Sequence, residues 1–365
     1  MRTTTLRFRS IASLITLGLV SAVITVASPA THLGAAGASV PSAPRSPTAS
    51  AGNGRATVRW AAPVSTNGSP ITAYLVWPYS GGKQLKARQF HSKATTQVIT
   101  GLANGRGYTF RVAARNAVGI GPKSSASAAI WTRWYPKKGA TWQWQLTGTV
   151  NTAFNVGVYD IDMFNNSAAV VAKLHHLGRK VICYVDVGSY ESFRPDKAKF
   201  PASVLGKTLD GFSNERWLDI RKISVLGPIM KARFTACKNK GFDAVEPDNV
   251  DGYDGNDTGF PLTGADQLRY NSWIARLAHS MGLGVALKND VNQVPQLVTS
   301  FDFELDEQCY EYTECNTLTP FTRAGKAVFE VEYNEAPAAF CPTMRALGFS
   351  SMKKDLDLTA ARQAC

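Results

Sequence analysis

The stretch GFDAVEPDNVDGY, residues 241–253, places four carboxylates beside a short apolar run. Acidic clusters of this kind are usually solvated loops or calcium sites, but the apolar residues around Val245 indicate a buried strand. Alternate residues of a strand face the same side, so Glu246 and Asp248 can project together while Val245 faces the other way. The stretch therefore predicts a strand that delivers acids to one end of a sheet.

Other apolar runs of strand length accompany this one and alternate with helical patterns. The predicted strands are 141–146, 156–161, 180–187, 242–246, 284–288, 301–306, 327–333 and 349–352. Helical patterns at 167–178, 224–241 and 267–284 each end at glycine, which is typical of a helix C-terminus. This alternation predicts an α/β domain over 141–365 with the (β/α)8 TIM-barrel fold. A doubly wound open sheet is the alternative, but no GxGxxG motif follows a strand.

Residues 40–132 have a different pattern, in which short alternating runs are broken by Gly, Pro, Asn and Ser. The runs are ATVRW (56–60), TAYLVW (72–77), TQVITGL (96–102) and YTFRVAARN (108–116). Strands of this length and spacing predict an antiparallel all-β sandwich. The polar segment 133–140, which contains Pro136, predicts a short linker between the two domains.

Residues 1–38 have the pattern of an export signal. Arg2, Arg7 and Arg9 precede an apolar run over 11–27, and small residues suited to signal-peptidase cleavage follow. The run has roughly 17 residues, the short limit for a membrane span, so a retained anchor is the less favoured alternative. We therefore expect a secreted, extracellular protein with no membrane attachment after cleavage.

The six cysteines of an exported chain favour disulfides over metal sites. Cys309 and Cys315 would close a short loop, and Cys341 with Cys365 would tie down the terminus. Cys183 and Cys237 are then left as the third pair by subtraction. The sequence alone leaves all three pairings open.

Charge is divided unevenly along the chain, whose net charge is +13. All 27 acids lie at or after Asp160, whereas the mature N-terminal part up to Arg133 has twelve Lys and Arg and no acid. A basic sandwich is either a passive spacer or an anchor on an anionic cell-wall or matrix polymer. Nucleic acid is not an expected partner, because no nucleic-acid-binding motif accompanies the charge.

Nearly every predicted barrel strand ends in a carboxylate. The active site of such barrels lies at the carboxyl ends of the strands, so these acids are expected at one rim. Aromatic residues accompany them, among them Trp142, Trp144, Tyr159, Tyr184, Tyr190, Tyr253, Tyr310 and Tyr333. A glycosidase needs one carboxylic acid to protonate the leaving oxygen, a second as nucleophile or base, and flat rings against the sugars. The surplus of acids favours a cationic sugar polymer.

These motifs resemble glycoside hydrolase family 114, the endo-α-1,4-polygalactosaminidases. The matching stretches are WQWQLTG (142–148), VYDIDMF (158–164), GRKVICYVDVGSYE (178–191), ERWLDI (215–220), GFDAVEPDNVDGY (241–253), LKND (287–290), DEQCYEYTEC (306–315) and AVFEVEY (327–333). The sandwich resembles a fibronectin type III domain at Trp60, Tyr74, Leu102, Tyr108, Asn116, Gly119 and Pro122. The resemblance implies a TIM barrel that cleaves galactosamine-rich polysaccharide without a cofactor, with Asp248 and Glu307 as its catalytic acids. The further candidates for substrate contacts are Trp142, Asp160, Asp162, Tyr184, Glu246, Lys288, Asn289, Glu332 and Tyr333.

Pattern and resemblance disagree over the strand at 301–306. Phe303 and Leu305 share one parity with Glu307, while Asp306 has the other. If the apolar residues pack outward, Asp306 faces the site and Glu307 reaches it only at a strand end or a bulge. The resemblance favours Glu307, and we follow it.

Other functions agree less well with the sequence than a glycosidase that cleaves galactosamine polymer. A calcium loop is not expected, because the acids over 248–254 lack the alternating ligands and closing Glu of an EF-hand. A serine hydrolase is excluded because the chain has no GxSxG motif. A non-catalytic carbohydrate-binding protein, or a glycosidase for another amino sugar or a neutral glycan, remains as the alternative.

Overall fold

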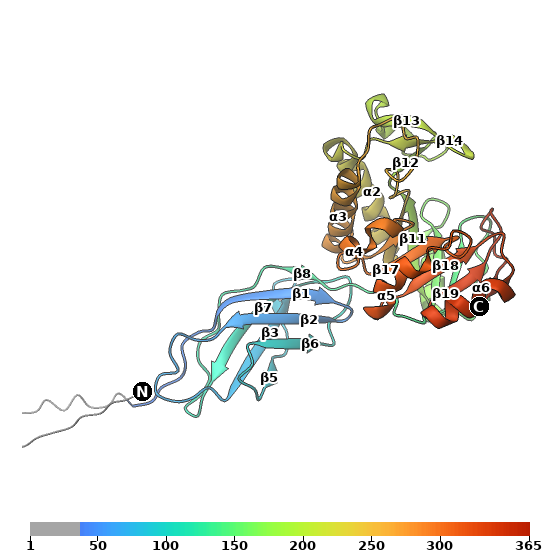
Figure 1. Ribbon diagram of the computed structural model, residues 1–365. Coiled ribbons are helices and arrows are strands. Elements are labelled where there is room, and N and C mark those ends of the chain that lie inside the picture. The colour runs from blue at the N-terminus through green and yellow to red at the C-terminus, as the bar shows by residue number, and fades with distance from the viewer. Residues whose placement is uncertain (1–36) are drawn as a thin grey trace, which may run out of the picture. The chain divides into compact units, whose positions relative to one another are not determined.

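The computed structural model describes residues 37–365, which comprise an N-terminal all-β domain and a C-terminal α/β domain (Figure 1). The predicted export signal at 1–38 lies outside the described residues except for its last two positions. Within residues 37–365, no helix has the length and apolar character that a membrane span requires. The predicted boundaries at 40–132, 133–140 and 141–365 stay predictions.

The N-terminal domain is the predicted sandwich of two antiparallel sheets. One sheet contains β1 (Arg45–Gly52), β2 (Arg55–Ala61) and β6 (Thr96–Thr100), and the other contains β3 (Ala73–Ser80), β4 (Lys83–Gln84), β5 (Arg88–Phe90), β7 (Gly107–Arg115) and β8 (Ile130–Trp131). The Trp60 ring packs edge-on against Tyr74 in the core, with ring centroids 5.0 Å apart. The Tyr108 hydroxyl accepts a hydrogen bond from the Ala103 amide at 3.0 Å, and so fixes the turn before β7.

The C-terminal domain contains the eight predicted strands, paired in parallel and in chain order. They are β9 (Trp142–Gln145), β10 (Val158–Asp162), β11 (Lys180–Asp186), β15 (Ala244–Asp248), β16 (Gly284–Lys288), β17 (Phe303–Glu307), β18 (Val328–Glu332) and β19 (Ser350–Lys353). Its helices are α1 (Ala168–His176), α2 (Ile223–Lys240), α3 (Gly264–Ser280), α4 (Val294–Leu297), α5 (Thr319–Arg323) and α6 (Pro337–Leu347), with short 3-10 turns η1 (Lys197–Lys199), η2 (Ala202–Val204), η3 (Val291–Gln293) and η4 (Cys315–Leu318). The three predicted helices are confirmed as α1, α2 and α3, and α2 ends at Gly241, whose φ is 94°.

Successive residues of each strand face opposite sides of the sheet, so the domain has two apolar cores, one inside the curled sheet and one outside it. The inner core includes one residue from each parallel strand: Trp142, Val158, Ile182, Ala244, Ala286, Phe303, Phe329 and Met352. The sheet is curled, because Trp142 of β9 stacks on Phe329 of β18 with ring centroids 4.4 Å apart, although five strands lie between β9 and β18 in the sheet order. The outer core packs the opposite parity, including Val245 and Leu287, against the helices.

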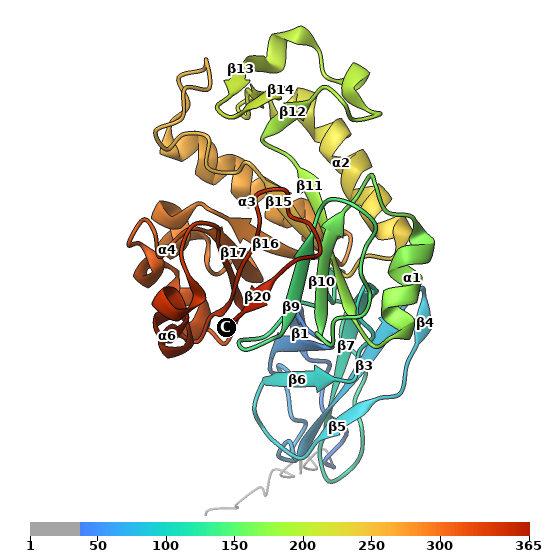
Figure 2. The same cartoon turned by 90° about the vertical axis from the view of Figure 1, so that its right-hand side faces the viewer.

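The C-terminal segment occupies the edge at which a barrel would close. β20 (Gln363–Ala364) pairs antiparallel with β19, and Ala360 accepts a hydrogen bond from the Gln143 side chain of β9 at 2.9 Å. Leu358 also accepts one from the Leu146 amide at 3.0 Å. Among residues 37–365 no ladder joins β9 to β19, so the predicted barrel is present as a curled sheet whose last gap contains this segment. Figure 2 shows β20 beside β9.

A small antiparallel sheet interrupts the connection between β11 and α2. It consists of β12 (Ser189–Glu191), β13 (Leu205–Leu209) and β14 (Phe212–Leu218) in the order β12-β14-β13. Figures 1 and 2 show it beyond the end of β11 from which the chain leaves the main sheet. The barrel pattern did not predict these strands, although Asp210–Gly211 between Leu209 and Phe212 is a typical hairpin signal.

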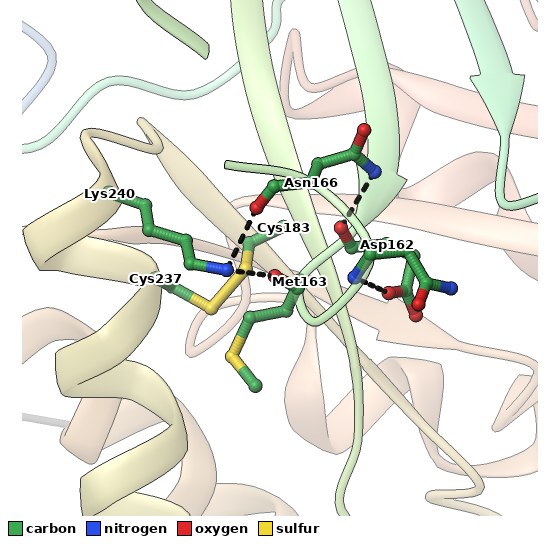
Figure 3. The surroundings of a disulfide bond; sticks show 7 residues. Asp162, Met163, Asn166, Cys183, Cys237 and Lys240 are labelled. Atoms are coloured by element: carbon green, nitrogen blue, oxygen red, sulfur yellow. Dashed lines mark hydrogen bonds between the residues drawn. A yellow bond between two sulfur atoms is a disulfide. The ribbon is translucent and has the colours of Figure 1, made fainter. Parts of the chain in front are cut away.

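The structure contains the three expected disulfides, Cys183–Cys237, Cys309–Cys315 and Cys341–Cys365. The first joins β11 to α2, and Figure 3 shows its surroundings. Nearby, Lys240 at the end of α2 donates hydrogen bonds to the carbonyls of Met163 and Asn166 at 2.6 and 2.8 Å. The disulfide and the lysine therefore fix α2 against both β11 and the loop that follows β10.

Candidate active site

Three neighbouring strands each end in one of the predicted site residues. Asp248, Lys288 and Glu307 are the last residues of β15, β16 and β17. Each is followed by a residue in the left-handed conformation: Asn249 (φ 58°), Asn289 (φ 52°) and Gln308 (φ 66°). Asn adopts this conformation more easily than most residues, which explains two of the three turns. The backbone leaves the sheet directly after each side chain, so all three lie at the same rim.

The inner core decides between Asp306 and Glu307. Phe303 and Leu305 pack inward, among the inner-core residues, and not outward as one alternative assumed. Glu307 is two residues after Leu305 and faces the same side of β17, so its side chain reaches the inner rim of a regular strand. The Asp306 side chain has the opposite parity, and the residue is only 1% exposed.

Lys288 joins the carboxylates at this rim. Its ammonium lies 2.8 Å from Glu246 Oε1, 3.0 Å from Glu307 Oε2 and 3.5 Å from Asp248 Oδ1. The lysine is buried, and its ammonium also lies 4.5 Å from the centroid of the Trp144 ring. A buried cation is costly unless it is paired, and here three anionic groups pair with it.

Glu307 accepts hydrogen bonds from several donors. Tyr333 donates its hydroxyl proton to Oε1, and the Asn289 side-chain amide donates to Oε2 at 3.1 Å. Burial opposes ionisation of Glu307, but Lys288 and these donors outweigh it and hold its pKa below the ordinary value. Asp248 accepts from the Tyr184 hydroxyl at 2.8 Å. The two predicted catalytic acids therefore have separate tyrosine partners and share one lysine.

The same contacts keep Lys288 charged. Burial favours the neutral amine, but Asp248, Glu246 and Glu307 outweigh burial and raise the pKa of Lys288 well above its ordinary value. The lysine is therefore a permanent cation at the rim and not a proton donor or acceptor near neutral pH.

A pair of carboxyl groups lies beneath the rim. Glu246 accepts a hydrogen bond from the Trp144 indole at 3.1 Å, and Asp160 is fully buried beside it. Burial and the neighbouring Glu246 raise the pKa of Asp160 well above its usual range. This environment favours the protonated, neutral form of Asp160 beneath the rim.

A cavity of about 590 Å³ opens above these residues. Asp248, Lys288 and Glu307 lie in its wall together with Tyr184, Asn289 and Tyr333. The small antiparallel sheet contributes Leu209, Asp210, Phe212, Glu215 and Trp217, the loop after β17 contributes Gln308, Tyr312 and Glu314, and the C-terminal segment contributes Leu356 and Leu358. None of these ten was among the predicted site residues. Only the hairpin signal at Asp210–Gly211 could have drawn attention to Phe212 from sequence.

Five of the predicted substrate contacts do not lie in the cavity wall: Asp160 and Glu246, which are buried beneath the rim, and three others. Trp142 is buried in the inner core, where its indole donates to the Ser350 carbonyl at 2.7 Å. Asp162 pairs with Arg194 at 2.7 Å, and Glu332 accepts from the Tyr310 amide at 2.8 Å. Trp142 lies two residues before Trp144 on β9 and therefore further from the rim. The carboxylates of Asp162 and Glu332 already interact with groups of the protein. Trp144, two residues further along β9, takes the place at the cavity.

The separation of the Asp248 and Glu307 carboxylates suits glycoside hydrolysis. The distances to Lys288 limit Asp248 Oδ1 and Glu307 Oε2 to at most 6.5 Å from each other, the sum of 3.0 and 3.5 Å. Carboxyl groups about 5–5.5 Å apart are typical of retaining glycosidases, and about 6.5–9.5 Å of inverting ones. Within the described residues, no group of three or more His, Cys, Asp and Glu side chains could hold a metal ion.

Comparison with known proteins gives two family matches and related solved structures. Residues 123–365 match the model of glycoside-hydrolase family GH114, and residues 42–130 match that of the fibronectin type III domain. The crystal structure of Aspergillus fumigatus Ega3 in complex with galactosamine is 37% identical, covers 64% of this chain and 97% of its own, and has a TM-score of 0.60. The glycoside hydrolase domain of PelA from Pseudomonas aeruginosa is 12% identical, covers 63% and 99% of the two chains, and has a TM-score of 0.49.

Proposed function

The chain belongs to glycoside-hydrolase family GH114 and is a glycoside hydrolase, and we propose that it is secreted and cleaves α-1,4-linked galactosamine polysaccharide within the chain. The observation that carries this proposal is the convergence of Asp248 and Glu307 on Lys288 in the wall of an open cavity. The solved relative that contains galactosamine supports the choice of sugar.

The proposed mechanism uses Asp248 and Glu307 as the two carboxylates and proceeds with retention. One carboxylic acid protonates the leaving glycosidic oxygen while the other attacks the anomeric carbon and forms a glycosyl ester. Water then cleaves this ester with the first residue acting as base. Two of their oxygens lie within 6.5 Å of each other, a limit that includes the separation of about 5–5.5 Å typical of retaining sites.

A cationic polymer suits the charge of the cavity. Besides the proposed catalytic pair, its wall contains Asp210, Glu215, Asp251, Asp254, Asp306 and Glu314, against the single lysine Lys288. Lys288 already interacts with three carboxylates, so the exposed acids of the wall, Asp210 and Asp254, can attract sugar ammonium groups. The proposed substrate contacts closest to the pair are Tyr184, Asn289 and Tyr333.

We interpret the fold as a TIM barrel whose last gap is filled by the C-terminal segment. The chain-order parallel pairing and the contact between Trp142 and Phe329 support this interpretation, as does the similarity to Ega3. Secretion is supported by the three disulfides, which form and persist in oxidising compartments.

The test is mass spectrometry of the products from partially deacetylated galactosaminogalactan. The wild-type enzyme should release short galactosamine-containing oligosaccharides, whereas Asp248→Asn and Glu307→Gln should each release almost none. Asp257→Asn is the matched control, since Asp257 is exposed and pairs only with the exposed Lys207. Unchanged polymer with the wild type would remove the proposed substrate, and full activity in both active-site variants would remove the proposed site. Cleavage of chitosan or a neutral galactan instead would assign another glycan.

A further inference from the structure

Exposed apolar side chains of the α/β domain gather at the cavity. In residues 141–365, the exposed large apolar side chains are Leu177, Phe193, Phe212, Val225, Tyr312 and Leu356. Phe212, Tyr312 and Leu356 all lie in the wall of this one cavity. Single exposed apolar residues are common, but several gathered at one cleft indicate a surface that a ligand covers.

Phe212 lies at the tip of a hairpin. It directly follows the two-residue turn Asp210–Gly211, in which Gly211 has a φ of 75°, and it pairs with Leu209 across the turn. The Phe212 residue is 60% exposed. The hairpin therefore presents the ring to the cavity without burying it in a core of its own.

Tyr312 lies on a loop that a disulfide closes. The disulfide between Cys309 and Cys315 closes this loop directly after Glu307 and Gln308. The Tyr312 amide donates to the Gln308 carbonyl at 3.0 Å, and the residue is 63% exposed. The disulfide and this hydrogen bond fix the loop, and the Tyr312 side chain remains largely exposed.

The sheet order places the catalytic pair between the two rings. The hairpin of Phe212 leaves the main sheet after β11, which pairs with β15, the strand of Asp248. The loop of Tyr312 follows β17, the strand of Glu307. One ring therefore borders the cavity on the Asp248 side and the other on the Glu307 side.

Each ring has a carboxylate neighbour in the cavity wall. Asp210 precedes Phe212 across the turn, and Glu314 lies two residues after Tyr312. A hexosamine has an apolar face of C–H groups and an ammonium group, so a ring beside a carboxylate matches both. Neither ring contacts the proposed reacting atoms, so both would act on sugars away from the cleaved bond.

We propose that Phe212 and Tyr312 are stacking platforms for hexosamine units bound on opposite sides of the cleaved bond. This inference rests on the proposed function for the identity of the sugar. The platforms hold a polymer across the catalytic pair, and this favours internal cleavage of long chains over removal of single end sugars. A short oligosaccharide that does not reach both platforms gains less from them.

Kinetics on long and short substrates test this role. Phe212→Ala and Tyr312→Ala should each raise KM for the galactosamine polymer about tenfold and change kcat little, because stacking binds substrate and transition state alike. The effect on the shortest cleavable oligosaccharide should be smaller, and Phe212→Trp and Tyr312→Phe should keep the low KM. Phe193→Ala is the matched control, since Phe193 is 58% exposed and does not line the cavity. Unchanged KM and product lengths in both alanine variants, with an active wild type, would overturn the platforms and leave the proposed function intact.

A binding measurement separates the two proposals. Electrophoretic retention of Asp248→Asn would be compared in gels that contain galactosamine polymer, chitosan or neutral galactan. Adding Phe212→Ala or Tyr312→Ala to this variant should lower its retention by at least one of the three polymers, whereas adding Phe193→Ala should not. This result would support the platforms even if the wild type does not cut galactosamine polymer. Retention by none of the three polymers would remove the platforms, and equal retention of all variants would do the same.

Discussion

Lys288 sets the electrostatics of the proposed catalytic residues. Its buried ammonium is within 3.5 Å of carboxylate oxygens from Glu246, Asp248 and Glu307, which lie on the two strands that flank its own strand β16. Without this cation three anions would share a poorly hydrated site, and at least one would take up a proton. The lysine thus favours the ionised form of Glu307.

Lys288→Met should lower kcat/KM by about a hundredfold, as expected when one preorganised charge is removed from an active site. Lys288 lowers the pKa of Glu307, so its loss should raise that pKa. The limb of the pH profile of kcat/KM that reports Glu307 should then move to higher pH. It is the acid limb if Glu307 acts as nucleophile or base, and the basic limb if it acts as the acid.

The control for this change is Lys207→Met, which removes an exposed lysine that pairs with Asp257. Its kcat/KM and pH profile should match those of the wild type. A Lys288→Met enzyme with the wild-type pH profile would show that Lys288 does not govern Glu307.

At the scale of the elements, the turn after β15 depends on close backbone packing. Asn249 is left-handed, and its side chain donates to Asp186 Oδ2 at 2.6 Å. The amides of Val187 and Gly188 both donate to the Asp248 carbonyl at 3.2 Å. A Cβ added at Gly188 would lie 1.6 Å from the Asn249 carbonyl oxygen, so only glycine fits beneath this turn. The strand ends of β11 and β15 are therefore locked together at Asp248.

Gly188→Ala should displace this turn and with it Asp248. A misplacement of about 1 Å at a catalytic group can cost about a hundredfold in rate, and overpacking typically costs about 1–3 kcal/mol of stability. We expect a lower melting temperature and a lower kcat in kinetic assays. Gly157→Ala is the control, because its Cβ would meet nothing closer than the Thr141 carbonyl oxygen at 3.6 Å. Wild-type kcat in Gly188→Ala would refute the coupling of this turn to Asp248.

At the scale of the whole molecule, the two domains differ in charge. Residues 40–133 include twelve basic residues and no acid, whereas every acid lies at or after Asp160. A basic domain joined to a hydrolase with an acidic cavity suits retention on an anionic wall or matrix polymer, since like charge would repel such a polymer from the cavity itself. We propose that the sandwich anchors the enzyme on such a polymer, and this role would be separable from catalysis.

Neutralising exposed lysines of the sandwich should weaken this retention and leave hydrolysis unchanged. The variant has Lys83→Gln, Lys86→Gln and Lys93→Gln, and its binding is measured by pull-down on alginate beads. Retention of the wild type should fall with added salt, because exposed charges are screened beyond about 10 Å at 0.1 M. The control has Lys197→Gln, Lys199→Gln and Lys222→Gln, which remove exposed cations of the α/β domain. Equal retention of all three proteins would show that the sandwich is only a spacer.

Local periodicity was enough to predict which residues form the strands and which acids end them. Alternation and turn residues act over a few neighbours, so the eight parallel strands, the sandwich and helices α1 to α3 could be located from the chain alone. The motif resemblance added Asp248 and Glu307, which the structure brings to one lysine.

The sequence by itself thus determined the strands, the acidic rim and the chemistry of the disulfides, whereas the tertiary structure decided which side of each strand faces the site. Phe303 and Leu305 could pack inward or outward on pattern alone, and only contacts with other strands made their face the inner one. The filling of the barrel gap by the C-terminal segment and the approach of Phe212 and Tyr312 to one cavity join segments far apart in the chain. Such contacts depend on how separate elements pack, and a periodicity confined to a few residues does not contain that information.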